Sequence, residues 1–179
     1  MATPTSLPAT FVAGNVLTAA QMNDLRGAFR ILQVVSTTKT DTFSTTESAY
    51  GSEVDITGLS ATITPTATSS NILVMFSVNA SQSDPATAGI AGVLLRDSTR
   101  IFVGTSGTQF MTNYQRYADS ADNMVMFSAQ YLDSPSTTSS VTYKYAIRSV
   151  STGTVYVNRR ASGTTTGLAS SITVMEVSA

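Results

Sequence analysis

The sequence contains no cysteine and no histidine, and these two absences exclude several kinds of chemistry. Without cysteine the chain has no disulfide framework, no thiolate metal site and no cysteine nucleophile, while the redox compartment stays open. Without histidine it has no imidazole base, no His-ligated zinc or iron and no Ser-His-Asp triad. We therefore expect no enzymatic activity, no metal site and no cofactor.

Charged residues are scarce as well. Only 12% of the 179 residues are charged, with 10 Lys and Arg against 11 Asp and Glu. A net charge of −1 gives no electrostatic footprint for a phosphate backbone, so we expect no nucleic-acid partner. Ser and Thr make up about three residues in ten, which favours extended and turn conformations over helices.

Long apolar runs are absent too. No segment approaches the roughly 18 to 20 apolar residues of a membrane span, and the opening "MATPTSLPATFVAG" does not have the pattern of a secretory signal. We expect a soluble protein made in a cytoplasm, without membrane insertion. The length favours one domain with a sizeable core, preceded by an N-terminal arm.

The arm is expected to be extended and then to form one short helix. Pro4 and Pro8 fix φ near −65° and push their neighbours towards extended geometry. Thr18 is a good N-cap, and Gln21 stands at the position that completes a capping box. The sequence therefore predicts a helix of about three turns before residue 30.

One face of this predicted helix is apolar. Met22, Leu25 and Phe29 recur at spacings of three and four, and Leu17 can pack on Met22 as a hydrophobic staple. A helix this short is not stable alone in water, so these four residues should pack against a platform. The platform could be the chain's own β-domain, two sister helices or a partner protein.

From Ile31 onward the hydrophobic pattern has period two. It predicts an antiparallel β-sandwich, jelly-roll-like in its fuller form, over 31–179, after an attachment region over 1–30. A bulge is expected at Thr57 and Gly58, and a hairpin around Asp97. The predicted strands cover 31–36, 53–64, 71–81, 90–97, 100–104, 123–132, 141–150, 154–160 and 171–177.

Two of these strands are apolar on both faces. Leu73 and Met75 alternate with one apolar set, and Met124 and Met126 alternate with another. In a two-sheet sandwich one face of a strand should meet water, so these four residues predict a subunit interface. Cover by a loop or by the N-terminal arm is an equally good explanation.

A few other residues were candidates for ligand binding. Tyr114 and Tyr117 flank Arg116, and aromatic rings beside polar groups can stack on sugars, so these three could contact a glycan. "DSADN" at 119–123 resembles part of a calcium loop, but it lacks the glycine and the distant glutamate of an EF-hand, and a solvated loop is favoured.

The remaining charged candidates are weaker still. Arg159 and Arg160 could grip an anionic partner, although a plain strand end explains them better. Lys39 and Lys144 are the only lysines available for a Ser-Lys mechanism, and neither lies in a supporting motif.

Two segments resemble a known class of proteins. "LPATFVAGNVLTAAQMNDLRGAFRILQVV" resembles the opening of small structural proteins of tailed bacteriophages, and "DITGLSATITPTATSSNILVMFSVNAS" resembles the β-domain that often follows. The resemblance implies a virion component, either a tail-fibre or minor tail protein or a capsid decoration protein, usually a homotrimer. It carries over no binding residues.

Three functions are therefore considered. The preferred one is a non-enzymatic tail-fibre or tail-tip protein that displays its sandwich for contact with the host surface, with a surface glycan as a candidate partner, and attaches to other virion proteins through residues 1–30. The second is a decoration, or cement, protein that stabilises capsomers. The third, a glycan hydrolase or esterase, is remote because the acidic residues are scattered among loops.

Overall fold

The computed structural model describes residues 16, 18, 31–83, 89–116 and 123–178. All regular elements in this part of the chain are β-strands, and they pair antiparallel in two sheets. The all-β sandwich predicted from the sequence is confirmed at this level. The predicted helix, with Leu17, Met22, Leu25 and Phe29, lies outside the described residues, and no helix is present within them.

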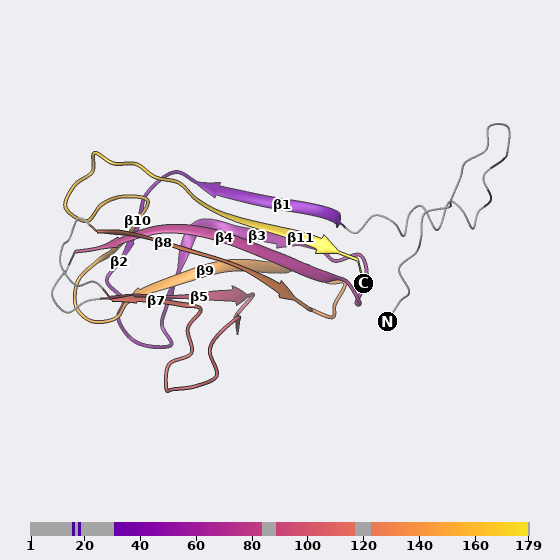
Figure 1. Ribbon diagram of the computed structural model, residues 1–179, viewed down its shortest axis with the longest axis horizontal. Coiled ribbons are helices and arrows are strands. Elements are labelled where there is room, and N and C mark those ends of the chain that lie inside the picture. The colour runs from indigo at the N-terminus through magenta and orange to yellow at the C-terminus, as the bar shows by residue number, and fades with distance from the viewer. Residues whose placement is uncertain (1–15, 17, 19–30, 84–88, 117–122, 179) are drawn as a thin grey trace.

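The two sheets interleave early and late strands of the chain (Figure 1). The first has the order β1-β11-β4-β10-β2, and β8 pairs with the edge of β4 opposite β11 and β10. The second has the order β3-β9-β5-β6, with β7 also pairing with β5. The strands are β1 (Ile31–Lys39), β2 (Phe43–Thr45), β3 (Val54–Ile63), β4 (Asn71–Gln82), β5 (Gly89–Arg96), β6 (Thr99–Ile101), β7 (Asn113–Arg116), β8 (Met124–Asp133), β9 (Val141–Ser149), β10 (Val155–Val157) and β11 (Ser170–Val177).

The core lies between the sheets and follows the predicted alternation. In β4, every second residue from Ile72 to Val78 is buried, and the intervening residues are partly exposed on the outer face. Full burial of each such aliphatic side chain stabilises the fold by about 1.5–3 kcal/mol. The rest of the core comes mainly from β3, β5, β9 and β11, with Tyr143, Tyr145, Ile147 and Ile172 among its largest side chains.

The predicted bulge and hairpin are both present. The register of β3 against β9 shifts between Asp55 and Ser60, and Gly58 within that interval has φ of +80°. Arg96 pairs with Thr99 across the turn from β5 to β6, where Asp97 adopts φ of +54°. Both irregularities therefore lie where the sequence interrupts an alternating pattern.

The strand prediction missed short elements. β2 and β7 were not predicted, and β10 is shorter than the expected strand. β2 and β10 have only three residues each, too few to show a period, and each is defined by the partner beside it. Pairing with β10 defines β2 where the local pattern gave no signal, whereas β10 lies within the predicted strand 154–160.

A buried carboxylate connects the β3–β4 turn to β11. Glu176 is fully buried, and its oxygens accept hydrogen bonds from the Thr66 backbone N–H and hydroxyl at 2.7 Å and from Gln33 Nε2 at 2.6 Å. Burial by itself raises the pKa of this carboxyl, but hydrogen bonds from Thr66, Ser70 and Gln33 outweigh it and lower the pKa to about 2. The charged form of Glu176 thus stabilises the end of the sandwich where β1 begins.

Candidate assembly face and loop tip

An apolar row crosses the outer face of the first sheet. The register places Val34 of β1 opposite Met175 of β11, Met175 opposite Leu73 of β4, and Leu73 opposite Leu132 of β8. Val34 and Leu132 are 54% and 53% exposed, while Leu73 and Met175 are partly buried between them. We call these four residues the apolar row. Contiguous exposed apolar side chains on a sheet are typical of interaction surfaces.

The next rows along the same face become polar. Two residues along each strand from the apolar row, the outer face presents Ser36, Thr173, Met75 and Gln130. Two residues further, it presents Thr38, Ser171, Ser77 and Ser128. The hydroxyls of Ser36 and Thr173 are 2.8 Å apart and hydrogen-bonded. The apolar part of the face is therefore confined to one end of the sheet.

That end is where the β-domain is entered from the N-terminal side. Ile31, 53% exposed, pairs with Val177 directly beside the apolar row, and Figure 1 shows the start of β1 and the end of β11 at the same end of the sandwich. Residues 1–30 are thus joined to the β-domain next to its apolar row.

The four predicted interface residues are not all together. Leu73 belongs to the apolar row and Met75 adjoins it, both partly buried on the outer face. Met126 is 61% exposed opposite Asn79, and Met124 is partly buried opposite Ser81. The Ser77 and Ser128 row separates the two methionines of β8 from the others.

Sequence reasoning did not identify Val34, Leu132 or Met175 as members of this face. Their strands lie far apart in the chain, and only the register brings them into line with Leu73. Val34 and Met175 each stood in a predicted strand with an alternating pattern. That pattern was the available signal, but it does not say which outward residues become neighbours.

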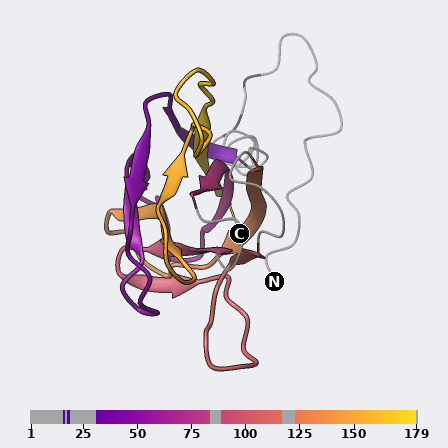
Figure 2. The ribbon, with the colours of Figure 1, turned by 90° about the vertical axis from the view of Figure 1, so that its left-hand side faces the viewer.

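A second feature is the loop between β6 and β7, residues 102–112, which projects from the body of the sandwich (Figure 2). The segment 101–115 contains no charged residue. The loop closes through hydrogen bonds from the Gly104 N–H to the Met111 carbonyl at 3.4 Å and from the Thr112 N–H to the Gly92 carbonyl at 3.0 Å. Its base is therefore anchored on β5.

The position of β7, where the chain returns from the loop, depends on the close packing of Tyr145 against Gly92. Tyr145 extends from the core and donates its hydroxyl to Asn113 Oδ1 at 3.0 Å, at the start of β7. A Cβ placed on Gly92 would lie 1.9 Å from that hydroxyl, so only glycine leaves room for it. Burial raises the pKa of Tyr145, which keeps the phenol protonated as a donor.

Three charged side chains support the loop from beneath. Glu53, just before β3, accepts hydrogen bonds from Arg148 Nε of β9 at 3.2 Å and from Arg100 Nη2 of β6. The side chains of Glu53 and Arg148 are 3% and 1% exposed. Arg148 also donates to the Ser48 carbonyl at 3.1 Å and to Gln109 Oε1 at 2.6 Å. A buried pair with all these partners is satisfied, whereas loss of one member would leave an uncompensated charge.

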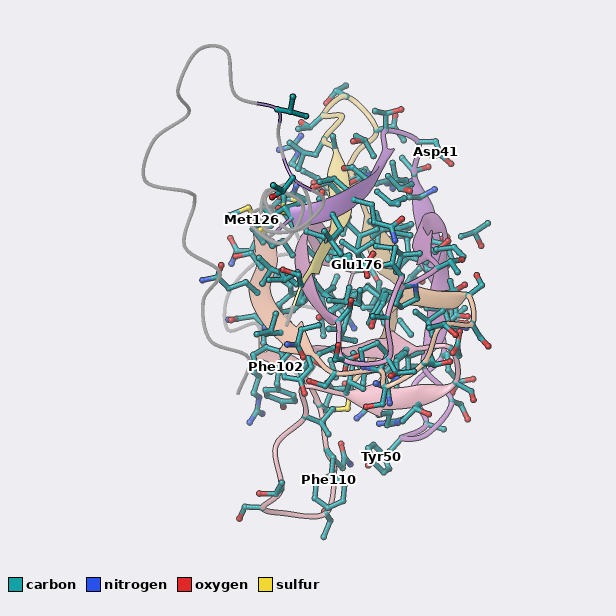
Figure 3. All side chains as sticks on the ribbon, turned by 90° about the vertical axis from the view of Figure 1, so that its right-hand side faces the viewer. Asp41, Tyr50, Phe102, Phe110, Met126 and Glu176 are labelled. Carbon is teal, nitrogen blue, oxygen red and sulfur yellow. The ribbon has the colours of Figure 1, made fainter. Side chains whose placement is uncertain are left out.

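Two aromatic residues lie over this support. The Arg100 guanidinium carbon is 4.9 Å from the centre of the Tyr50 ring, within cation–π distance. The Tyr50 hydroxyl accepts the Phe110 backbone N–H at 3.1 Å, and Arg100 Nη1 donates to the Phe110 carbonyl at 3.1 Å. Tyr50 and Phe110 are 39% and 37% exposed. Figure 3 shows them beside each other at the projecting loop, away from Met126. We call Tyr50 together with residues 102–112 the loop tip.

The predicted glycan contacts are only partly described. Tyr114 is 55% exposed on β7 opposite Ala91, and Arg116 is exposed opposite Gly89. Tyr117 lies outside the described residues, as does 119–122 of the candidate calcium loop. Within the described ranges, no group of three or more acidic residues could hold a metal ion. No helix there is long and apolar enough to cross a membrane.

The other charged candidates have structural partners. Lys39 Nζ is 2.8 Å from Asp41, and Lys144 Nζ is 2.6 Å from Asp55. The Arg159 guanidinium carbon lies 4.2 Å from the centre of the Tyr156 ring. The Lys144 pair is a partly exposed surface ion pair, whereas Lys39 is buried and reaches the exposed Asp41.

Comparison with known proteins gives structural similarities alone. No family model matches the chain, and no curated protein matches it. Among solved structures it is similar to the Eiger TNF of S. frugiperda, with 9% identity and a TM-score of 0.40, over 84% of this chain and 94% of that one. It is also similar to a chain of infectious bursal disease virus, Gt strain, with 14% identity and a TM-score of 0.41, over 82% of this chain and 38% of that one. Both TM-scores are below 0.5, so nothing that those proteins do is carried over to this chain.

Proposed function

We propose that the chain is a non-enzymatic structural subunit of a tailed-phage virion, most specifically a tail-fibre or tail-tip component that displays its β-sandwich towards the host surface. The apolar row of Val34, Met175, Leu73 and Leu132 carries this proposal. Such a row beside the junction with residues 1–30 supports assembly through this end of the domain. The resemblance of residues 7–35 and 55–81 to phage structural proteins supplies the biological setting.

The order of the strands in the two sheets supports the same proposal by analogy with other proteins. The order β1-β11-β4-β8 facing β3-β9-β5-β7 is that of a jelly roll, in which successive long strands alternate between two sheets. Jelly rolls form many capsid and lectin domains, although a fold alone does not determine function.

We further propose that the assembled form is a homotrimer. Its contacts would use the apolar row and Met75, and in a wider interface Met124 and Met126 on β8. The apolar row supports association, while the number of subunits follows from the family resemblance.

The deciding experiment deletes residues 1–30 and follows incorporation into particles. The described strands begin at Ile31, so we expect the shortened chain to fold, as checked by circular dichroism and thermal melting, yet to be missing from purified particles. Normal incorporation of the shortened chain would contradict attachment through the arm.

Two full-length variants make the same test within the arm. Leu25→Asp combined with Phe29→Asp removes the predicted apolar stripe, at a cost of about 3 kcal/mol in docking, and should abolish incorporation. Thr18→Ala should cost about 1 kcal/mol and leave incorporation largely intact. Location of the full-length chain by cryo-electron microscopy of particles then separates a tail component from a capsid decoration protein.

A further inference from the structure

We propose that the loop tip binds a neutral saccharide, with the exposed rings of Tyr50 and Phe110 as its contact surface. The proposal rests on the proposed display of the sandwich towards a host surface, and it assigns the binding site and the chemistry of the ligand.

The backbone of Phe110 forms the hydrogen bonds that anchor it, and its side chain is left exposed. Its N–H donates to the Tyr50 hydroxyl and its carbonyl accepts from Arg100, each at 3.1 Å. The side chain takes part in neither bond and remains 37% exposed. The fold thus holds the backbone of residue 110 in place while presenting an aromatic ring, a residue type that is expensive to leave in water without a partner.

The loop that carries Phe110 is itself neutral and rich in hydroxyls. Between residues 101 and 115 the chain carries threonine, serine, glutamine and asparagine but no charge. A sugar ring has apolar C–H faces and a rim of hydroxyls, so aromatic faces with neighbouring hydroxyl and amide groups complement it. Binding loops that use tyrosine, serine, glycine and asparagine in this way combine rigid aromatic contacts with adaptable hydrogen bonds.

The nearby cations are already engaged. Arg148 is 1% exposed and bonded to Glu53, Gln109 and backbone carbonyls, and Arg100 is bonded to Glu53 and the Phe110 carbonyl. Arg148 is thus shielded from an outside anion, and Arg100, whose side chain is 24% exposed, already uses its guanidinium on Glu53 and the Phe110 carbonyl. A neutral ligand therefore fits the loop tip better than an anionic one.

The support beneath the loop also favours binding by limiting its entropic cost. Ordering a mobile loop on a ligand would consume part of the interaction energy. Here Gln109, Phe110 and Met111 are each already bonded to an arginine or to the loop's own backbone. The Phe110 backbone and the Tyr50 hydroxyl are thus held in place before a ligand arrives.

The experiment applies the full-length chain to a glycan array that carries neutral and acidic bacterial surface oligosaccharides, and measures the best-binding oligosaccharide by calorimetry. We expect binding to neutral saccharides and at least a tenfold loss of affinity in Phe110→Ala. The melting temperature should fall only slightly, because both hydrogen bonds of residue 110 come from its backbone and the ring that is lost is partly exposed. Tyr114→Ala is the matched control: it removes a more exposed ring outside the loop tip and should bind normally.

Several outcomes would overturn the proposal. These are binding to acidic saccharides alone, binding to no saccharide on the array, normal binding by Phe110→Ala, or a loss of binding in Tyr114→Ala instead. Capture of a host protein whose binding survives removal of its sugars would also overturn it, in favour of a protein partner.

Particle incorporation is scored separately in the same variants. Incorporated Phe110→Ala that has lost saccharide binding supports both proposals, and incorporated wild type without saccharide binding refutes this one alone.

Discussion

The apolar row and the loop tip are held in place in different ways. In the apolar row, the hydrogen-bonded backbone of four strands aligns Val34, Met175, Leu73 and Leu132. At the loop tip, the backbone is irregular and the side chains of Glu53, Arg100 and Arg148 fix its shape. Substitution should therefore change association at the first surface and local folding at the second.

The largest effect is expected from Leu73→Asp. A carboxylate in the middle of the apolar row cannot be buried without a partner, so the variant should dissociate to the 18.8 kDa single chain. Light scattering at micromolar concentration measures this against the trimer expected for the wild type. Ser77→Asp adds the same charge to the same face of β4, in the polar row, and should leave the assembly intact. A wild type that is already monomeric would refute the trimer.

Glu53→Gln should be the most damaging change beneath the loop tip. It leaves buried Arg148 without its carboxylate, and breaking a buried ion pair costs about 3–5 kcal/mol. Urea denaturation measures the loss in the free energy of unfolding. Asp55→Asn is the control, because its ion pair with Lys144 is half exposed and should contribute under 1 kcal/mol. Equal losses in the two variants would mean that Glu53 does not support the loop as described.

Acid should weaken the end of the sandwich beneath the apolar row. The pKa of Glu176 is lowered from 4.5 to about 2 in the folded chain, so its contribution is complete above pH 4.5 and disappears as the pH falls towards 2. The corresponding loss is about 3 kcal/mol at most. Unfolding titrations between pH 6 and pH 2 measure it, and Glu176→Gln should show a flatter profile over that interval. An unchanged slope in Glu176→Gln would assign the acid effect to another group.

The smallest effect is expected from Tyr50→Phe. This change keeps the ring over Arg100 and removes the acceptor for the Phe110 N–H, which contributes about 0.5–1 kcal/mol at this exposure. Amide hydrogen exchange is the sensitive measurement. Exchange at Phe110 should accelerate several-fold, while the Thr112 amide, bonded to the Gly92 carbonyl, should exchange as before. Unaltered exchange at Phe110 would show that this hydrogen bond does not restrain the loop.

The sequence predicted those parts of the fold that depend on local alternation. The inward set of β4, the bulge near Gly58 and the hairpin at Asp97 were all confirmed, because each leaves its mark within a few residues. The composition of the outer face was only partly predicted, since the alignment of Val34 and Leu132 with Leu73 depends on strand register.

The loop tip could not be predicted from local pattern at all. Glu53 stands 47 residues from Arg100 and 95 from Arg148 along the chain, and only the folded sheets bring them together. One signal was present: in a chain with 12% charged residues, Arg148 interrupts the otherwise uncharged stretch 145–158 of strand and turn residues. A lone charge in a buried strand requires a partner, although the sequence does not identify it.

The hydrogen bonds that anchor the loop are unevenly distributed along it. The hydrogen bonds act on the Gly104 N–H at the start of the loop and on residues 109–112 at its end, and a Cβ on Gly107 would meet nothing within 4 Å. Residues 105–108 can therefore be exchanged or lengthened without disturbing the support beneath them, with Gly107, at φ +100°, as the position that resists replacement. The projecting part of the loop can therefore differ in sequence and length while the sandwich beneath it keeps its structure.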